Sequence, residues 1–258
     1  MIESLKRHWP EYLIEAAGLG FFMIAACSFA VALEHPASPI RELLPAFPRR
    51  ALMGLAMGAT AIAIIYSPWG KRSGAHINPA VTWTFYRLGK IEGWDALFYV
   101  LAQFTGGVLG VVIAVLALGA WVSHPSINYA ATIPGSYGIP LAFAAEVAMA
   151  FLMMSMILEV TNQARLARFT GIFAGILLFA FITFEAPISG MSINPARTFG
   201  SAFNARLWTA LWLYFLAPPL GMALAAEVHR RTSHPTVRCA KLHHDNDERC
   251  IFRCGYAT

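Results

Sequence analysis

Residues 73–82 read SGAHINPAVT, and residues 189–198 read SGMSINPART. The two stretches share the pattern S-G-x-x-I-N-P-A-x-T, and each follows a charge-poor apolar stretch. Both are too polar to face lipid. A polar phrase that is broken by proline and occurs twice in a hydrophobic chain predicts a solute path built from two related halves.

The composition of the chain is that of a membrane protein. Apolar residues make up 57% and charged residues 13%, whereas soluble domains average about 25% charged residues. The mean hydropathy is +0.56. A helix that spans a bilayer needs roughly 20 apolar residues. Six stretches qualify: 12–33, 51–66, 96–122, 139–158, 169–188 and 207–226. The first apolar run is too long for a cleavable signal peptide. We therefore expect an all-α, multi-pass integral membrane protein of a plasma membrane or a bacterial inner membrane.

The positions of the basic residues predict the orientation of the chain, whose formal net charge is +5. Short basic loops stay in the cytoplasm. Basic residues lie before the first span, between the second and third, between the fourth and fifth, and after the sixth: Lys6, Arg7, Lys71, Arg72, Arg87, Lys90, Arg165, Arg168, Arg230, Arg231 and Arg238. The loop 123–138 contains no Lys or Arg. Both termini are therefore expected in the cytoplasm.

Three arginines in the first external loop break this pattern: Arg41, Arg49 and Arg50. We interpret them as surface residues that Glu34 and Glu42 partly offset. Membrane orientation and lipid headgroups account for the basic residues as a set, so nucleic-acid binding is not expected.

The repeat extends beyond the shared phrase. Glu15 opens the first span, and a second intramembrane acid, Glu146, opens the fourth. Glycine pairs four residues apart lie in the second and fifth spans: Gly54 and Gly58, and Gly171 and Gly175. Because small residues at this spacing let helices approach closely in lipid, these two spans are expected to cross at the pseudo-symmetry axis.

Three spans in each half is an odd number, so the two halves must be inverted relative to each other. The first phrase then enters from the cytoplasm and the second from outside. The expected organisation is an N-terminal segment, a first half with its re-entrant loop, an external loop, a second half with its re-entrant loop, and a basic tail: 1–11, 12–122 with 67–89, 123–138, 139–229 with 189–206, and 230–258.

Each phrase is followed by a stretch that is too short to span and is expected to form a half-helix: 81–89 and 198–207. Pro79 and Pro195 suit the first helical turn, where a missing N–H costs nothing. Asn78 and Asn194 suit the N-cap, where the side-chain oxygen accepts a backbone N–H. The two half-helices are expected to meet near the membrane midplane with their positive ends together.

These residues resemble the major intrinsic protein family, the aquaporins and aquaglyceroporins, over residues 12–229. The resemblance rests on paired Asn-Pro-Ala boxes at inverted positions, the second followed directly by Arg197. It implies a right-handed bundle of six helices with two re-entrant half-helices, a homotetramer in the lipid bilayer, and one pore in each subunit. It also implies passive passage of water and small uncharged solutes, exclusion of ions and protons, and no enzymatic activity.

The resemblance assigns roles to particular residues. The Asn-Pro-Ala boxes would line the pore centre: Asn78, Pro79, Ala80, Asn194, Pro195 and Ala196. Arg197 would lie in the outer selectivity filter. Glu15 and Glu146 would hold the backbone of the re-entrant loops, because a buried acid in lipid normally has a partner. For His76, pore lining and a structural hydrogen bond to the loop both remain open.

The expected filter departs from the water-specific pattern. Counting back from Arg197 places Met191 and Ile182 in the filter, and ungapped counting adds Gly58, or Met57 if the loop carries one extra residue. Water-selective members usually have His where this chain has Ile182. The filter of this chain resembles that of plant nodulin-like members, which favours glycerol or metalloid acids as an alternative with low water flux.

Other positions favour a water channel. Thr198 stands where glycerol facilitators usually have Asp. Ala202 and the pair Tyr214-Phe215 before Pro218 also look more like aquaporins. A secondary transporter and a structural junction protein are more distant alternatives. Measuring flux with and without ion gradients, and measuring water permeability, would separate them from a channel.

The tail holds a cluster of possible metal ligands: Cys239, His243, Cys250 and Cys254. Three thiols and an imidazole suit a tetrahedral zinc site. Lipidation of a juxtamembrane cysteine and inert thiols in a mobile tail are the alternatives. No other cofactor is expected.

Overall fold

The computed structural model describes residues 1–232, 237–244 and 247–256, and these ranges contain helices and no strands. The longer helices are α1 (Ile2–Glu34), α3 (Ala46–Tyr66), α6 (Gly93–Leu118), α7 (Ile139–Asn162), α8 (Thr170–Phe184) and α11 (Leu211–Thr232). The shorter α-helices are α2 (Pro39–Leu43), α4 (Pro68–Ser73), α5 (Pro79–Arg87), α9 (Ala186–Ser189) and α10 (Pro195–Ala205). Three short 3-10 turns are η1 (Gly119–Trp121), η2 (Asn128–Ala130) and η3 (Ala167–Phe169).

The six longer helices are long and apolar enough to cross a membrane, so the prediction of six spans is confirmed. Most boundaries differ from the expected ones by a few residues, and the first differs the most. The first helix begins at Ile2 rather than near residue 12, because it continues beyond its apolar stretch into a polar turn where Arg7 pairs with Glu3. The fifth ends at Phe184, and the separate helix α9 begins at Ala186.

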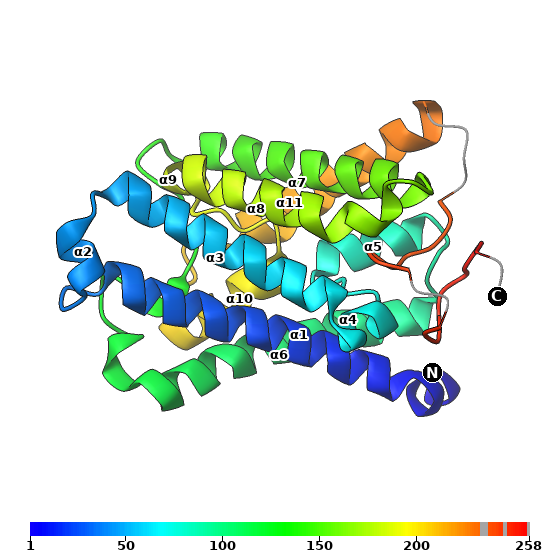
Figure 1. Cartoon of the computed structure of the whole chain (residues 1–258), viewed down its shortest axis with the longest axis horizontal. Coiled ribbons are helices and arrows are strands. Elements are labelled where there is room, and N and C mark those ends of the chain that lie inside the picture. Colours follow the sequence, from blue (N-terminus) through cyan, green and yellow to red (C-terminus); the bar gives the residue numbers. More distant parts are fainter. Residues whose placement is uncertain (233–236, 245–246, 257–258) are drawn as a thin grey trace.

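The helices pack in three main pairs, one within each half of the chain and one that joins the two halves (Figure 1). Helix α1 packs along α6, α7 along α11, and α3 along α8. The α3–α8 crossing is the one expected from the glycine pairs. A Cβ atom at Gly58 would lie 2.5 Å from the carbonyl oxygen of Gly175, and one at Gly175 would lie 2.8 Å from that of Gly58. Glycine lets these two backbones touch, which is how helices associate closely in lipid.

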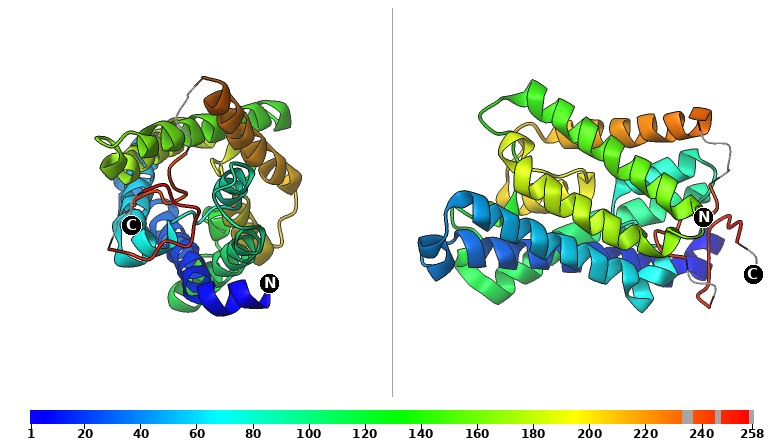
Figure 2. Two further views of the ribbon diagram at one scale, coloured as in Figure 1. Left: turned by 90° about the vertical axis from the view of Figure 1, so that its right-hand side faces the viewer. Right: turned by 45° about the horizontal axis from the view of Figure 1, so that its top comes forward.

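The bundle has two distinct ends (Figures 1 and 2). The N-terminus and the described segments 237–244 and 247–256, together called the tail, lie at one end, which we call the terminal end. Helices α2 and α9 lie at the opposite end, which we call the loop end. Seen end-on, the helices form a ring, and the half-helices α5 and α10 lie within the bundle (Figure 2). The solute path expected from the sequence would run between these two ends.

Candidate functional site

The two re-entrant loops have the same unusual backbone. In the first loop φ is positive at Ala75 (54°) and at Ile77 (40°), and in the second at Met191 (50°) and Ile193 (48°). Left-handed backbone is costly for a β-branched residue such as isoleucine. The same strain at equivalent positions of both loops shows that the sequence repeat is also a repeat of conformation, and such strain is typical of functional segments.

The buried carboxylate of Glu15 holds the first loop. Its Oε1 accepts hydrogen bonds from Ser73 Oγ (2.8 Å) and the backbone N–H of His76 (3.1 Å). Its Oε2 accepts from the backbone N–H of Ile77 (2.6 Å) and from Gln103 Nε2 (2.8 Å). Four donors on one fully buried side chain fix the loop against α1 and α6. The geometry is that of a loop anchor and leaves both oxygens occupied.

The buried carboxylate of Glu146 holds the second loop in the same way, by accepting hydrogen bonds. Its Oε1 accepts from Ser189 Oγ and from the backbone N–H of Ser192, both at 2.7 Å. Its Oε2 accepts from the backbone N–H of Ile193 at 2.6 Å. Ser189, Ser192 and Ile193 are the repeat equivalents of the loop residues that Glu15 holds.

The two asparagines cap the half-helices and also connect them. Asn78 Oδ1 accepts the N–H of Ala80 (2.9 Å), and Asn194 Oδ1 accepts the N–H groups of Ala196 (3.1 Å) and Arg197 (3.2 Å). Both prolines occupy the first helical turn. These are the N-cap and N1 positions to which asparagine and proline are suited.

The amide nitrogens of the same asparagines cross between the halves. Asn78 Nδ2 donates to the carbonyl of Ile193, and Asn194 Nδ2 donates to the carbonyl of Ile77, both at 2.8 Å. Each NH2 group has two donors, so each retains a second N–H for a solute at the point where α5 and α10 meet. The positive ends of both half-helices face that point.

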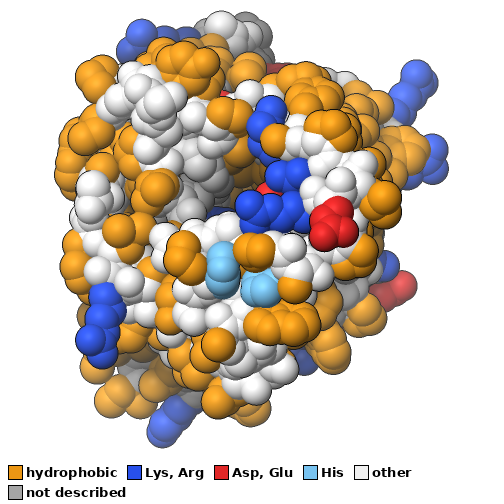
Figure 3. Space-filling model, turned by 90° about the vertical axis from the view of Figure 1, so that its left-hand side faces the viewer, with side chains coloured by type: hydrophobic (Ala, Val, Ile, Leu, Met, Phe, Trp, Pro, Cys, Tyr) orange, Lys and Arg blue, Asp and Glu red, His pale blue; other side chains and the backbone are white. Residues whose placement is uncertain are grey.

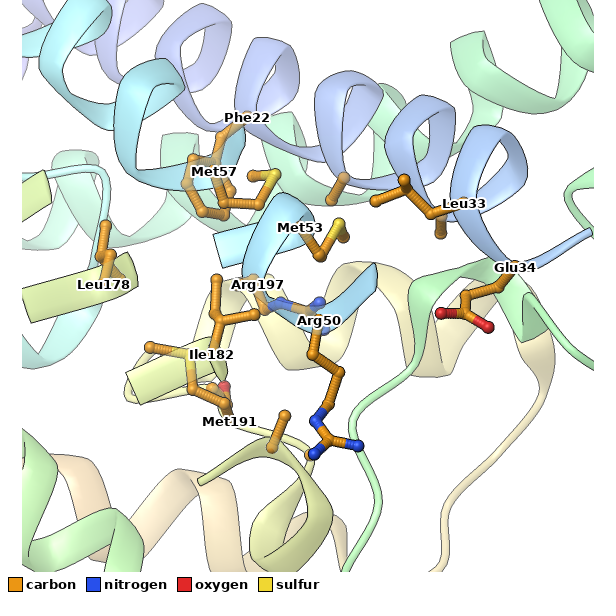
Figure 4. Close-up of a pocket in the computed structure, with 15 residues that line it drawn as sticks. Phe22, Leu33, Glu34, Arg50, Met53, Met57, Leu178, Ile182, Met191 and Arg197 are labelled. Carbon is orange, nitrogen blue, oxygen red and sulfur yellow. The ribbon is translucent and has the colours of Figure 1, made fainter. Parts of the chain in front are cut away.

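A cavity of about 190 Å³ lies on the loop-end side of this junction (Figure 4). Its labelled lining residues include Met57, Ile182, Met191 and Arg197, which come from α3, α8, the second loop and α10. Arg197 Nη1 donates to the carbonyl of Ala130 at 2.8 Å, which fixes the guanidinium against η2. Three of these four residues, Ile182, Met191 and Arg197, are ones that counting in the sequence assigned to the filter.

Gly58 is not among the residues that line this cavity, so its assignment to the filter is wrong. It lies against the backbone of Gly175 in the α3–α8 crossing. Its neighbour Met57 is 2% exposed and lines the cavity instead. The segment between α3 and the first phrase therefore contains one residue more than ungapped counting against the second half assumes. This is the alternative that the sequence left open.

Other residues around the cavity were not expected from the sequence. Arg50, Met53 and Glu34 also line it (Figure 4). Arg49, beside Arg50, forms a bidentate ion pair with Glu34, in which Nε lies 3.0 Å from Oε1 and Nη2 lies 2.9 Å from Oε2. Figure 3 shows the loop end hollowed at its centre, with Lys and Arg side chains on the rim. The signal was present, because these arginines broke the charge pattern expected for an external loop.

On the terminal-end side, the ring of His76 is enclosed. Its Nδ1 lies 3.1 Å from Thr82 Oγ1, and its Nε2 lies 2.8 Å from the carbonyl oxygen of Ala240 in the tail. Phe85 and Phe252 stack on the ring with centroid distances of 5.2 and 5.3 Å. Contact with the tail was not foreseen from the sequence, and it occupies Nε2 of the His76 ring.

The tail brings four possible metal ligands together: Cys239, His244, Cys250 and Cys254. Their ligand atoms all lie within 4.8 Å of one another. The structure therefore replaces His243 with its neighbour His244 in the expected set, since the ring of His243 packs edge-on against Tyr66 instead.

Two of the tail cysteines shift each other's pKa. Cys239 Sγ and Cys250 Sγ lie 3.5 Å apart. A hydrogen bond from Cys239 lowers the pKa of the Cys250 thiol to about 5, and the same contact together with burial raises the pKa of Cys239.

Comparison with known proteins gives a family signal over most of the chain. The profile of the family described as Major intrinsic protein matches residues 2–229. Glycerol uptake facilitator protein-like 6 of Lactiplantibacillus plantarum is 36% identical over 67% of this chain and 81% of its own length. Aquaporin Z of Bradyrhizobium diazoefficiens is 29% identical over 85% and 92% of the two chains. A probable aquaporin NIP-type of Nicotiana alata is 32% identical over 90% and 82%.

A solved structure supports the fold independently. The aquaglyceroporin from Plasmodium falciparum matches with a TM-score of 0.73 over 89% of this chain and 98% of that chain. Because the sequence identity is 19%, this likeness bears on the fold alone. The predicted six-helix architecture is confirmed by this match together with the family profile. The tail cluster begins at Cys239, beyond the last residue that the profile matches.

Proposed function

Because this chain belongs to the major intrinsic protein family, we propose that its pore passes small uncharged solutes as well as water and excludes ions and protons. The family and the named relatives support a channel for water or small solutes. The proposal adds the selectivity, which comes from residues particular to this chain.

The observation that carries the proposal is the wall of the cavity beside Arg197. Met57, Ile182 and Met191 present apolar surface, and Arg197 presents its donors. Selectivity in aquaporin-type pores depends on pore diameter, on the donors and acceptors that line it, and on electrostatic barriers. A solute with both apolar carbon atoms and hydroxyl groups suits this cavity, because its carbon atoms can contact the apolar side chains while its hydroxyl groups accept hydrogen bonds from Arg197. Methionine adapts its shape, so two of them give a pliable aperture.

The same apolar wall favours a second candidate, a facilitator of glycerol or a metalloid acid with low water flux. The apolar part of the wall offers water little in exchange for its lost solvent contacts. Glycerol or undissociated boric acid would gain more from contact with Ile182 and Met191.

Exclusion of cations and protons follows from the charges along the path. The N-termini of α5 and α10 meet at the pore centre, and Arg197 lies beside them. A helix N-terminus carries a partial positive charge of roughly half a unit. Three positive features in one narrow path make an electrostatic barrier to cations.

The assembly and the orientation are also part of the proposal. The positive-inside rule favours a cytoplasmic terminal end, because the basic segments lie mainly there. The family resemblance favours a homotetramer with one pore in each subunit. Chemical cross-linking of the protein in membranes would test the tetramer, and protease protection of the tail would test the orientation.

The test of selectivity is stopped-flow permeability in proteoliposomes with water, glycerol, urea and boric acid. Phe252→Asp is included as a second variant, because Phe252 of the tail stacks on His76 and its loss should loosen the tail. We expect permeability to water and to at least one further solute, both unchanged by an ion gradient. Passage of water alone would refute the proposed selectivity. Flux that requires an ion gradient would support a transporter, and no flux from either protein would refute the channel.

A further inference from the structure

We propose that Cys239, His244, Cys250 and Cys254 bind one zinc(II) ion, and that this ion holds the tail against the first re-entrant loop, where it closes the terminal-end mouth of the pore. The metal site stands on the geometry of the tail alone. The closure rests on the proposed channel function.

The four side chains fit a tetrahedral zinc ion. Three cysteines and one histidine are an established structural zinc set, with bonds of about 2.3 Å to sulfur and 2.0–2.1 Å to nitrogen. Those bond lengths place neighbouring ligand atoms about 3.5–3.8 Å apart in a tetrahedron. Cys239 Sγ and Cys250 Sγ lie 3.5 Å apart, and Cys254 Sγ lies 3.1 Å from His244 Nε2. With all four atoms within 4.8 Å of one another, small side-chain adjustments suffice to bind the ion.

The surroundings orient the histidine for this role. The ring of His244 stacks on Tyr256 with a centroid distance of 4.3 Å and an interplanar angle of 25°. The Tyr256 hydroxyl donates to the carbonyl of Thr161 at the end of α7. Metal-binding histidines are usually held in place by such outer contacts. The stack connects the proposed ligand to the membrane bundle.

A buried cation lies next to the cluster. Lys241 is 1% exposed and lines the same small pocket as Cys239 and His244, and its Nζ donates to the carbonyl of Arg249 at 2.8 Å. A zinc ion bound to three thiolates and a neutral imidazole carries a net charge of −1. Buried charges normally have a partner of opposite sign, and the zinc centre would be one for Lys241.

Individual contacts hold the tail against the bundle, such as the hydrogen bond from the N–H of Arg238 to Asn162 and the ion pair of Arg253 with Glu92. The described residues of the tail form no helix or strand. Several of them are nevertheless buried against the bundle: Val237, Cys239, Ala240, Lys241, Leu242 and Phe252. In short segments without regular structure, metal binding itself supplies folding free energy. On coordination each thiol would release its proton to solvent, so that three thiolates bind the ion.

The tail contacts the atoms that a solute leaving the first loop would meet. The N–H of Leu242 donates to the carbonyl of Gly74 at 3.1 Å, and the carbonyl of Ala240 lies 2.8 Å from His76 Nε2. Phe252 stacks on the His76 ring. Figure 2 shows the tail crossing the end of the helical ring. A tail fixed in this place closes the path.

The binding test measures zinc in the purified full-length protein, kept reduced, loaded with Zn²⁺ and freed of excess metal. We expect about one zinc per chain, as a single four-ligand set requires. His244→Asn and Cys254→Ser should lose the bound zinc. His243→Asn is the matched control and should keep it, because its ring lies against Tyr66. Equal zinc content in His244→Asn and the wild type, or no zinc in the wild type, would overturn the site.

A rescue variant separates coordination from folding. His244→Cys creates a set of four cysteines, which is also a structural zinc set, and should restore the bound metal. Loading with Co²⁺ gives a second readout, because bound thiolates produce charge-transfer absorption in the near ultraviolet. That absorption should be absent in Cys254→Ser proteins that elute as folded channels. Its persistence there would argue against the proposal.

The closure test measures water flux in proteoliposomes before and after treatment with a membrane-permeant zinc chelator. The chelator should raise flux several-fold in the wild type and in His243→Asn, and have no effect on His244→Asn, whose flux is already high. Unchanged wild-type flux would overturn closure and leave the zinc measurement standing. If no protein conducts in any condition, the channel proposal fails while the zinc content still decides the metal site.

Discussion

The two re-entrant loops are built alike, yet the two ends of the path that they form are different. Each loop has a buried glutamate anchor, an isoleucine whose backbone is left-handed, and an asparagine that caps its half-helix. Beyond the second loop lies an open cavity with Arg197 in its wall. Beyond the first loop, the tail covers His76.

This difference indicates that repeated residues and residues that differ between the halves have different roles. The repeated residues build the backbone of the path, so they must be the same in both halves. In the proposed channel, the residues that differ between the halves would decide what passes: Met191 and Arg197 at one end, and His76 with the tail at the other. Mutations of repeated residues should therefore damage assembly, and mutations of unrepeated residues should change selectivity or gating.

The largest effect is expected from removing the anchors. Glu15 accepts four hydrogen bonds and Glu146 accepts three. Each buried donor left unpaired costs about 1–3 kcal/mol. We expect Glu15→Ala to be the more damaging, with both variants losing most assembled protein on size-exclusion chromatography after mild heating. Glu42→Ala, at an exposed position, is the control. If both variants yield as much assembled protein as the wild type, the loops keep their structure without the glutamate anchors.

A smaller effect is expected at the asparagines. Loss of an N-cap costs about 0.5–2 kcal/mol, and loss of the crossing bond leaves a carbonyl without its partner. Asn194→Ala should slow water flux more than Asn78→Ala, because Asn194 caps two N–H groups and Asn78 caps one. Asn194→Ser keeps a capping oxygen without the crossing donor and should be intermediate. Equal flux in all three variants and the wild type would exclude the asparagine amides from the path.

The repeated parts of the molecule are the parts that the sequence predicted well. The shared phrase, the intramembrane acids and the glycine pairs each appear twice, and a repeated signal gives positions that can be checked against each other. The half-helices begin at Pro79 and Pro195, a few residues before the expected stretches, because the proline itself is the first helical residue.

The unrepeated parts were harder to predict for physical reasons. Whether Gly58 or Met57 faces the cavity depends on how tightly α4 turns, and no periodic pattern records that. The choice between His243 and His244 depends on how the tail folds against Tyr66 and Tyr256. Contact between Ala240 and His76 joins residues that are 164 positions apart. Such long-range contacts leave no trace in a single sequence.

Arg197→Val tests the loop-end side of the comparison without disturbing the anchors. The arginine contributes a full positive charge beside the path, and its removal leaves the half-helix N-termini as the remaining barrier. We expect a proton leak under an imposed pH gradient, with water flux retained. Arg50→Val, which removes another arginine that lines the same cavity, should leak less. Proton conductance equal to wild type in Arg197→Val would place the barrier at the centre of the pore.

The smallest expected effect is a change of selectivity at Ile182. Ile182→His would place a donor and an acceptor in the cavity wall, at a position where the wild type has an apolar side chain. One added hydrogen bond contributes about 0.5–1.5 kcal/mol, so the ratio of water to glycerol permeability should rise roughly 2- to 10-fold. Leu178→His is the matched control, because Leu178 lines the same cavity one turn away along α8. If both variants shift the ratio equally, the polarity of the cavity as a whole sets selectivity. If neither shifts it, the width of the opening between Met57 and Met191 is the deciding property, and the shape of the path then matters more than its chemistry.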